Sequence, residues 1–278
     1  MSLNSINTNV GAQIALQTLN STNAQLEEAQ NQVSTGLRIS SAKDDGAIWS
    51  IAQSQRSQIT SLTAVTDSLN RASSVLDVAV TAGQTISDLL NQLKSNALEA
   101  SDTSLSTTDR AALNASFKSL ITQIGTAVSN ASFDGANLIS HGASALVSLA
   151  GAGGQTLTLG AQDLSLGGGN LGAALSATAS YASAASATSL LGSINTAITK
   201  VNSAVSALGT ESNQVTSSLS FVSSLSDSLN GGIGNLVDAD VAAESATLQA
   251  LQTKQQLGIQ ALSIANSSSQ NLLSLFKG

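Results

Sequence analysis

The feature that most constrains this chain is a long, unbroken row of apolar residues at alternating spacings of three and four. The row consists of Leu62, Val65, Leu69, Ala72, Leu76, Ala79, Gly83, Ile86, Leu90, Leu93 and Ala97. Such spacing places every member on one stripe of an α-helix and is typical of helices that pack side by side as coiled coils. As one helix the row would extend for about 54 Å at 1.5 Å per residue.

Two further rows predict partners for this helix. One runs through Leu191, Ile194, Ile198, Val201, Val205, Leu208, Ser212, Val215, Leu219, Val222, Ser226, Leu229, Ile233 and Leu236, and a shorter one through Leu113, Phe117, Leu120, Ile124 and Ala127. Thr107, Thr108 and Asp109 are suitable capping residues before the short row. The chain has no proline and only 2% aromatic residues, so long helices packed through aliphatic side chains are expected. The fold class predicted is mainly α, a long coiled-coil bundle.

Composition excludes several kinds of function. The chain has no cysteine and a single histidine, His141, so disulfides, thiolate metal sites and a multi-histidine metal site are not expected. The formal charge is −7 without a cluster of basic residues, which argues against nucleic acid as a partner. No stretch approaches the ~20 apolar residues that span a bilayer. We expect no cofactor, no metal, no membrane insertion, no cleavable signal and no catalysis.

The two ends are poor in charge. Residues 1–37 carry only Glu27 and Glu28, and residues 245–278 carry only Lys254 and Lys277. The N-terminal end has a weak seam in which Asn23 and Gln30 occupy positions between its leucines and Val33. The C-terminal end spreads its apolar residues over more than one helix face, so it needs several neighbours. We expect these ends to become ordered mainly on assembly with other subunits.

The segment 135–189 has a different composition, rich in Gly, Ala and Ser, with Asp163 as its one charged residue. Alternation at Thr156–Leu159, bounded by glycines, predicts short strands and tight turns. A compact β excursion is the interpretation we favour, and a flexible linker is the alternative. Before the long helix, the glycine-bounded loop 36–46 contains Lys43, Asp44 and Asp45, which suggests either a local ion pair or a contact between subunits.

Several motifs resemble those of bacterial flagellins. They are Ser5-Ile6-Asn7-Thr8-Asn9, Ser34-Thr35-Gly36-Leu37-Arg38-Ile39 and Ser41-Ala42-Lys43-Asp44-Asp45 near the N-terminus, Phe133-Asp134-Gly135 after the short row, and Leu236-Val237-Asp238-Ala239-Asp240 with Gln255-Gln256-Leu257-Gly258-Ile259-Gln260-Ala261-Leu262 near the C-terminus. The variant Asp45-Gly46-Ala47-Ile48-Trp49 resembles the short flagellins of alphaproteobacteria. The resemblance covers about residues 1–140 and 190–278.

The resemblance implies an extracellular flagellar filament subunit that polymerises with itself. It implies four parts: residues 1–37 with 238–278 form the inner tube, 38–46 connect, 47–134 with 190–237 form the coiled-coil bundle, and 135–189 form an exposed variable region. It also implies type III export, an export chaperone, and filament cap and hook-filament junction proteins as partners. The residues expected at the assembly interface are Leu16, Leu26, Val33, Arg38, Lys43, Asp44, Asp45, Leu251, Leu262 and Phe276.

Two other functions remain open at this point. A hook-filament junction protein would share the terminal helices but form only a few turns of assembly. A secreted hydrolase would have to use the central region, although the sequence has no H-E-x-x-H zinc motif.

Overall fold

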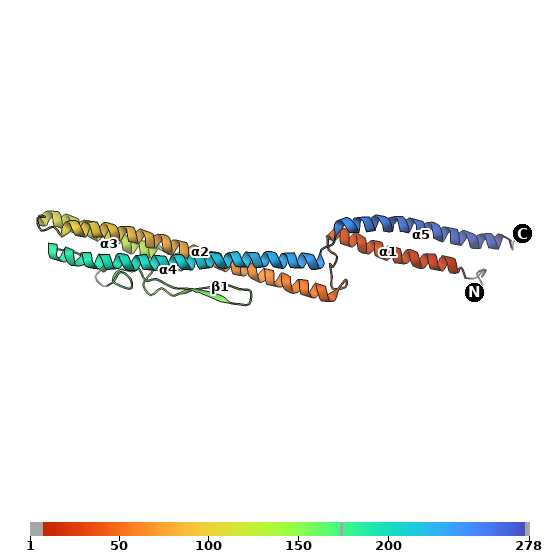
Figure 1. The fold of residues 1–278 in the computed structure, drawn as a ribbon, viewed down its shortest axis with the longest axis horizontal. Helices are drawn as coiled ribbons and strands as arrows, with labels where there is room; N and C mark the ends of the chain where they lie inside the picture. Colours follow the sequence, from red (N-terminus) through yellow and green to blue (C-terminus); the bar gives the residue numbers. More distant parts are fainter. Residues whose placement is uncertain (1–7, 173–174, 276–278) are drawn as a thin grey trace. The chain divides into compact units, whose positions relative to one another are not determined.

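The computed structural model of the chain describes residues 8–172 and 175–275, with side chains up to residue 267. The helices in these ranges are α1 (Val10–Thr35), α2 (Gly46–Ala100), α3 (Thr107–Asn130), α4 (Ala184–Val237) and α5 (Val241–Leu275). Strands β1 (Leu146–Leu149) and β2 (Thr156–Leu159) form a two-stranded antiparallel sheet. The mainly α fold class with a small central β excursion is therefore confirmed (Figure 1).

Contacts divide the chain into two compact units. Unit 1 consists of residues 1–57 and 228–278, and unit 2 consists of residues 58–227. The divisions fall inside α2 and α4. Unit 1 therefore contains α1, α5 and the adjoining ends of α2 and α4, while unit 2 contains α3, the sheet and the remaining parts of α2 and α4. The two units are described separately below.

The predicted apolar row on α2 forms the core of unit 2. Every one of its members from Leu62 to Ala97 is buried. The α4 row supplies the facing surface, since its members in unit 2 are buried or half-buried. Figure 1 shows α2 and α4 side by side, and Ser87 Oγ donates to Asn202 Oδ1 at 2.9 Å between them. A Cβ at Gly83 would lie 2.6 Å from Val205 Cγ2, so only glycine fits this close approach.

The predicted row on α3 is only partly correct, because Phe117 and Ile124 are buried but Leu113, Leu120 and Ala127 are not fully buried. Its buried face is formed by Phe117, Ile121, Ile124 and Val128, while Leu120 and Ala127 are only half-buried. The reason is that α3 packs against the central excursion as well as against its helical neighbours. The ring of Phe117 meets that of Tyr181 edge to face, with centroids 5.2 Å apart. The core of α3 therefore keeps Phe117 and Ile124 from the predicted row and adds Ile121 and Val128.

The predicted cap of α3 is also corrected, because Ser106 is the N-cap residue. Its Oγ accepts from the N–H of Asp109 and donates to Asp109 Oδ2, so Thr107 and Thr108 are the first helical residues instead. Arg110 then anchors the preceding turn. Its buried guanidinium donates to the carbonyls of Ala100, Asp102 and Leu105, which satisfies acceptors that the end of α2 would otherwise leave unpaired.

The central excursion packs on the helices, so the flexible-linker alternative is wrong. Ser148 Oγ and Ser68 Oγ lie 3.0 Å apart, which joins β1 to α2. The N–H of Gly160 donates to Glu211 Oε1 on α4 at 2.9 Å. Tyr181 donates its hydroxyl proton to the buried Asn96 Oδ1, and burial raises the pKa of Tyr181 to about 12. These side-chain bonds hold the glycine-rich segment in a defined conformation.

A matched pair of substitutions on α2 tests the placement of the core. Leu90 is fully buried, whereas Leu98 is 58% exposed on the same helix. Leu90→Ala leaves a cavity and should lower the free energy of unfolding by about 2–5 kcal/mol. Leu98→Ala should change it by less than about 0.5 kcal/mol. Chemical denaturation followed by circular dichroism measures both values, and equal effects would contradict this core.

Candidate assembly interface

Helices α1 and α5 form an antiparallel pair in unit 1. Asn9 Nδ2 donates to the carbonyl of Ala265 at 2.8 Å, near one end of the pair. Farther along, Gln255 Nε2 donates to Asn23 Oδ1 at 2.7 Å. Asn9 also caps α1, because its side chain accepts from the N–H of Ala12. The pairing is therefore fixed in register by polar side chains as well as by packing.

The seam of this pair combines small residues with aliphatic ones. Thr22, Ala29 and Leu251 are buried in it, and a Cβ at Gly258 would lie 3.3 Å from Leu19 Cδ1. The predicted seam position Gln30 is wrong, since it is exposed and the neighbouring Ala29 is buried. Asn23 is exposed as well, but it accepts the bond from Gln255 across the pair, next to the buried Thr22. Small side chains let the two helices approach closely, and that approach selects the stripe that faces the partner.

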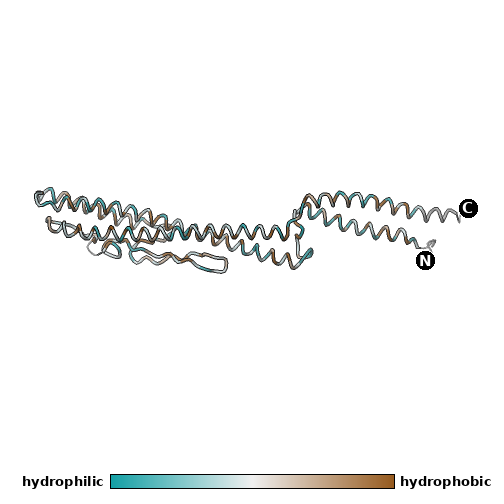
Figure 2. Tube along the Cα trace, viewed as in Figure 1, coloured by the Kyte–Doolittle hydropathy of each residue, from teal (hydrophilic) through white to brown (hydrophobic). Residues whose placement is uncertain are grey.

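Large apolar side chains lie outside this seam. The exposed ones on the pair are Val10, Ile14, Leu16, Val241, Leu257, Ile259 and Ile264. Figure 2 shows apolar positions recurring along both helices. Exposed leucine or isoleucine residues are ordinary when scattered singly, but here they recur on two charge-poor helices, a pattern that marks an interaction surface. Val10 and Ile14 were not among the residues predicted for the interface. Both are apolar and lie outside the predicted seam, and that position could have identified them as candidates for contact with another subunit.

The apolar residues predicted for assembly fall into two groups. Leu16 is exposed, 48% of its surface being accessible. Leu26, Val33 and Leu262 are half-buried and Leu251 is buried. Leu16 is thus available to another molecule, while the other four contribute to the pair within one chain. Phe276 lies outside the described residues.

The loop after α1 is joined to the end of α4 by backbone hydrogen bonds. Gly36 ends α1 in the left-handed conformation at φ 69°, which glycine adopts without strain. Its carbonyl accepts from the N–H of Ala239, and the N–H groups of Arg38 and Ile39 donate to the carbonyl of Val237. Arg38 Nη2 also donates to the carbonyl of Leu236 at 2.7 Å. Arg38 therefore bonds within its own subunit.

The two acidic residues of the loop act as caps. Asp44 Oδ2 accepts from the N–H groups of Ser40 and Ser41 and from the hydroxyl of Ser40. Asp45 Oδ1 accepts from the N–H groups of Ala47 and Ile48 at the start of α2. Their hydrogen bonds go to these backbone and serine groups, which does not support the local ion pair suggested for Lys43. The side chain of Lys43 is exposed.

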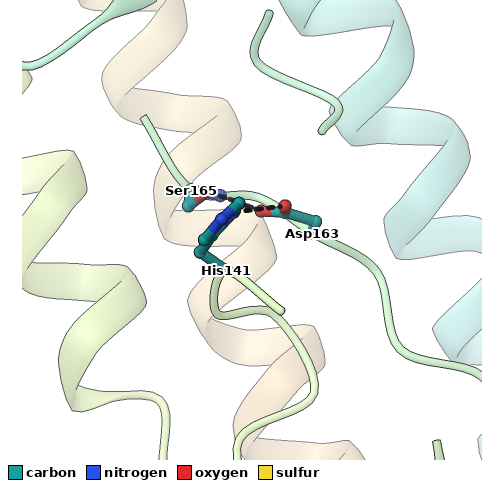
Figure 3. A network of polar contacts seen from close by, with 3 residues as sticks. All are labelled: His141, Asp163 and Ser165. Carbon is teal, nitrogen blue, oxygen red and sulfur yellow. Dashed lines mark hydrogen bonds and ion pairs between the residues drawn. The ribbon is translucent and has the colours of Figure 1, made fainter. Parts of the chain in front are cut away.

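The single histidine belongs to a separate polar network in unit 2 (Figure 3). His141 Nδ1 lies 3.1 Å from Asp163 Oδ2. Ser165 donates its N–H and its hydroxyl to Asp163 Oδ1. Partial burial acts to raise the pKa of Asp163, but the bonds from Ser165 and the neighbouring His141 outweigh it and lower the pKa overall. Because the serine hydroxyl faces the carboxylate and not the imidazole, this is not a nucleophile and base arrangement.

Within residues 8–172 and 175–275, no cluster of three or more His, Asp or Glu side chains is arranged to hold a metal ion. In the same part of the chain, no helix is long and apolar enough to cross a membrane.

Acidification tests the loop capped by Asp44. Hydrogen bonds from the N–H of Ser41 and then from the hydroxyl and N–H of Ser40 hold the pKa of Asp44 below its usual value. Its contribution to loop stability is therefore present above the ordinary aspartate pKa of about 4 and is lost as pH falls through the lowered value. The protection factors of the Ser40 and Ser41 amides, which correct for the pH dependence of intrinsic exchange, should fall over that window. Asp44→Asn should remove the dependence, and a pH profile identical to the unsubstituted chain would contradict it.

Comparisons with known proteins agree with the geometry of both units. The family model described as the bacterial flagellin N-terminal helical region matches residues 6–144, and that of the C-terminal helical region matches residues 191–276. The chain is 52% identical to flagellin FljM of Caulobacter vibrioides over 277 residues, with 100% of both chains covered. It is 39% identical to a flagellin of Brucella melitensis, with 99% of both covered, and 31% identical to flagellin C of Rhizobium meliloti.

The matched regions contain α1, α2, α3 and α5, most of α4 and nearly all of the motif residues singled out from the sequence. No observation favours the junction-protein or hydrolase alternatives, since the relatives that match over their whole length are flagellins. The chain belongs to the bacterial flagellin family and is a flagellin of the short alphaproteobacterial type.

Proposed function

We propose that this chain, a structural subunit of the flagellar filament, polymerises mainly through the outer faces of its α1–α5 pair. The observation that carries the proposal is the set of exposed aliphatic side chains on that pair, which includes Ile14, Leu16, Leu257, Ile259 and Ile264. Residues 1–37 and 245–278 carry four charged side chains between them. Neighbouring copies can therefore cover this surface without burying many charges.

The apolar residues of the pair have different tasks in this proposal. Leu26, Val33, Leu251 and Leu262 hold α1 and α5 together, and Leu16 contacts a neighbouring subunit directly. Phe276 is assigned to the same interface from the sequence alone. Isolated helix pairs have few neighbours to bury their apolar surface, which supports the view that the ends become fully ordered on assembly.

The loop residues are proposed to set the contact between neighbouring strands of subunits. Arg38, Asp44 and Asp45 shape the loop through the hydrogen bonds described above, and Lys43 presents an exposed ammonium group. A rigid, charged loop fixes register better than it supplies affinity, because exposed ion pairs contribute only about 0–1 kcal/mol.

We propose the four parts of the subunit that the family resemblance implies. Residues 1–37 with 238–278 would form the inner tube of the filament, 38–46 the connection, 47–134 with 190–237 the bundle, and 135–189 the exposed variable region. Self-polymerisation and a filament outside the cell are the family's properties.

We propose three further partners. They are an export chaperone that receives the segment from Leu248 to Phe276, the filament cap and the hook-filament junction proteins. We propose no catalytic role.

Substitutions on α5 test the two tasks. Ile264 is 69% exposed, so Ile264→Asp should leave the pair intact in the folded chain but block elongation of filament seeds, because a buried, unpaired carboxylate costs several kcal/mol. Leu262→Asp places the charge in the seam of the pair and should block elongation as well, with the central bundle still folded. Ile264→Leu is the matched control and should elongate normally. Elongation is scored by electron microscopy, and normal filaments from either aspartate variant would contradict the placement.

A further inference from the structure

Helix α4 carries an exposed aromatic side chain within unit 2. Phe221 is 64% exposed, and Leu225 is 37% exposed one turn later. Side chains four residues apart lie on one face of a helix, so the two form a single apolar ridge, here called the Phe221 ridge. An aromatic ring gains more than other side chains from removal from water. Its exposure in the monomer therefore points to a contact made in an assembly.

The surface around the Phe221 ridge has features that lower the cost of removing it from water. Residues 212–226 contain no charged side chain. Their hydroxyl groups already donate to backbone carbonyls one turn back, at Thr216, Ser217, Ser218, Ser220 and Ser224. Covering these five hydroxyl groups leaves none of them without a partner, which lowers the desolvation cost of burying the surface. In a chain of charge −7, an uncharged stretch is also where two copies approach with least repulsion.

A receptor for such a ridge exists elsewhere on the same unit. A groove between α2 and α3 has a volume of about 430 Å³ and is lined by small and apolar side chains, among them Val78, Ala82, Ala127 and Ala131. Asp77 is the only charged residue of its lining. We call it the α2/α3 groove. It can accept an aromatic ring, and the uncharged surroundings of Phe221 place no carboxylate against Asp77.

The groove cannot be filled by the ridge of its own chain. Val205 of α4 lies against Gly83 of α2, at the level of the groove residues. Phe221 is about 24 Å farther along α4 at 1.5 Å per residue. The occupant of matching chemistry is therefore a second copy, which a polymerising subunit meets at high local concentration.

We propose that the Phe221 ridge of one subunit packs into the α2/α3 groove of a neighbouring subunit in the filament. This inference rests on the proposed function and adds a contact in unit 2 to the α1–α5 interface. Ridge and groove are different surfaces of one molecule, so the contact is heterologous. Heterologous contacts whose rotation does not close a ring repeat from copy to copy, as an open filament requires.

Because the chain has no cysteine, engineered thiols report the contact cleanly. Phe221→Cys and Val78→Cys chains are mixed, polymerised on filament seeds and oxidised. Disulfide-linked dimers should appear in the filaments and be absent from the same mixture kept monomeric. The matched control pairs Phe221→Cys with Asn91→Cys, an exposed position on α2 outside the groove, and should give no dimers. Dimers with Asn91→Cys but not with Val78→Cys would overturn the proposal.

Polymerisation thresholds give a second measurement. Phe221→Ser should raise the lowest chain concentration that elongates seeds by about tenfold, while thermal unfolding of the monomer stays unchanged. Phe221→Leu should restore most of the loss. An unchanged threshold together with absent crosslinks, in filaments that otherwise form normally, would overturn this contact alone. Failure of the unsubstituted chain to elongate seeds would contradict the proposed function, and this contact with it.

Discussion

The burial of one continuous apolar row along α2 is the interaction on which the bundle depends. From Leu62 to Ala97 every third or fourth residue is buried, and the facing row of α4 covers it in unit 2. The contact is close enough that Gly83 has no room for a side chain beside Val205. Because the chain has no proline and few aromatic residues, stability has to come from many aliphatic contacts of this kind. The glycine-rich excursion is then held by single hydrogen bonds to these helices, such as those at Ser68 and Glu211.

The α1–α5 pair differs from the bundle because it leaves many of its apolar side chains exposed. Its seam is narrow because Thr22 and Ala29 occupy the buried positions, and many of its large aliphatic residues point elsewhere. In a protein that remained a monomer these residues would be a liability for aggregation. In the proposed filament they provide the surface that neighbouring copies cover. The loop at residues 36–46 is likewise suited to contact another subunit. Asp44 and Asp45 accept backbone hydrogen bonds that fix its conformation, and Lys43 stays exposed.

The long helices could be predicted from the sequence because a seam repeated over many turns allows only one phase. The β2 strand was predicted at the bounds observed, since alternation between glycines leaves little choice. Short or weak seams were not predictable in the same way. The phase of α1 depends on how close α5 approaches, and the burial of Ile121 and Val128 on α3 was not visible in the spacing of the predicted row. The buried bonds of Arg110 and the partner strand β1 also depend on tertiary contacts. For the interface, the charge-poor ends could be identified from the sequence. The side chains that face outward could be identified only from the way α1 and α5 pair.

Seeded polymerisation is the measurement that tests the central claim most directly. Purified full-length chain and a chain lacking residues 1–37 and 245–278 are each added to short filament seeds and followed by electron microscopy. The account predicts long filaments from the full chain only, while circular dichroism shows that the shortened chain retains its helical bundle. Elongation by the shortened chain, or a full chain that stays monomeric or forms only short rings on the same seeds, would contradict assembly through the terminal helices.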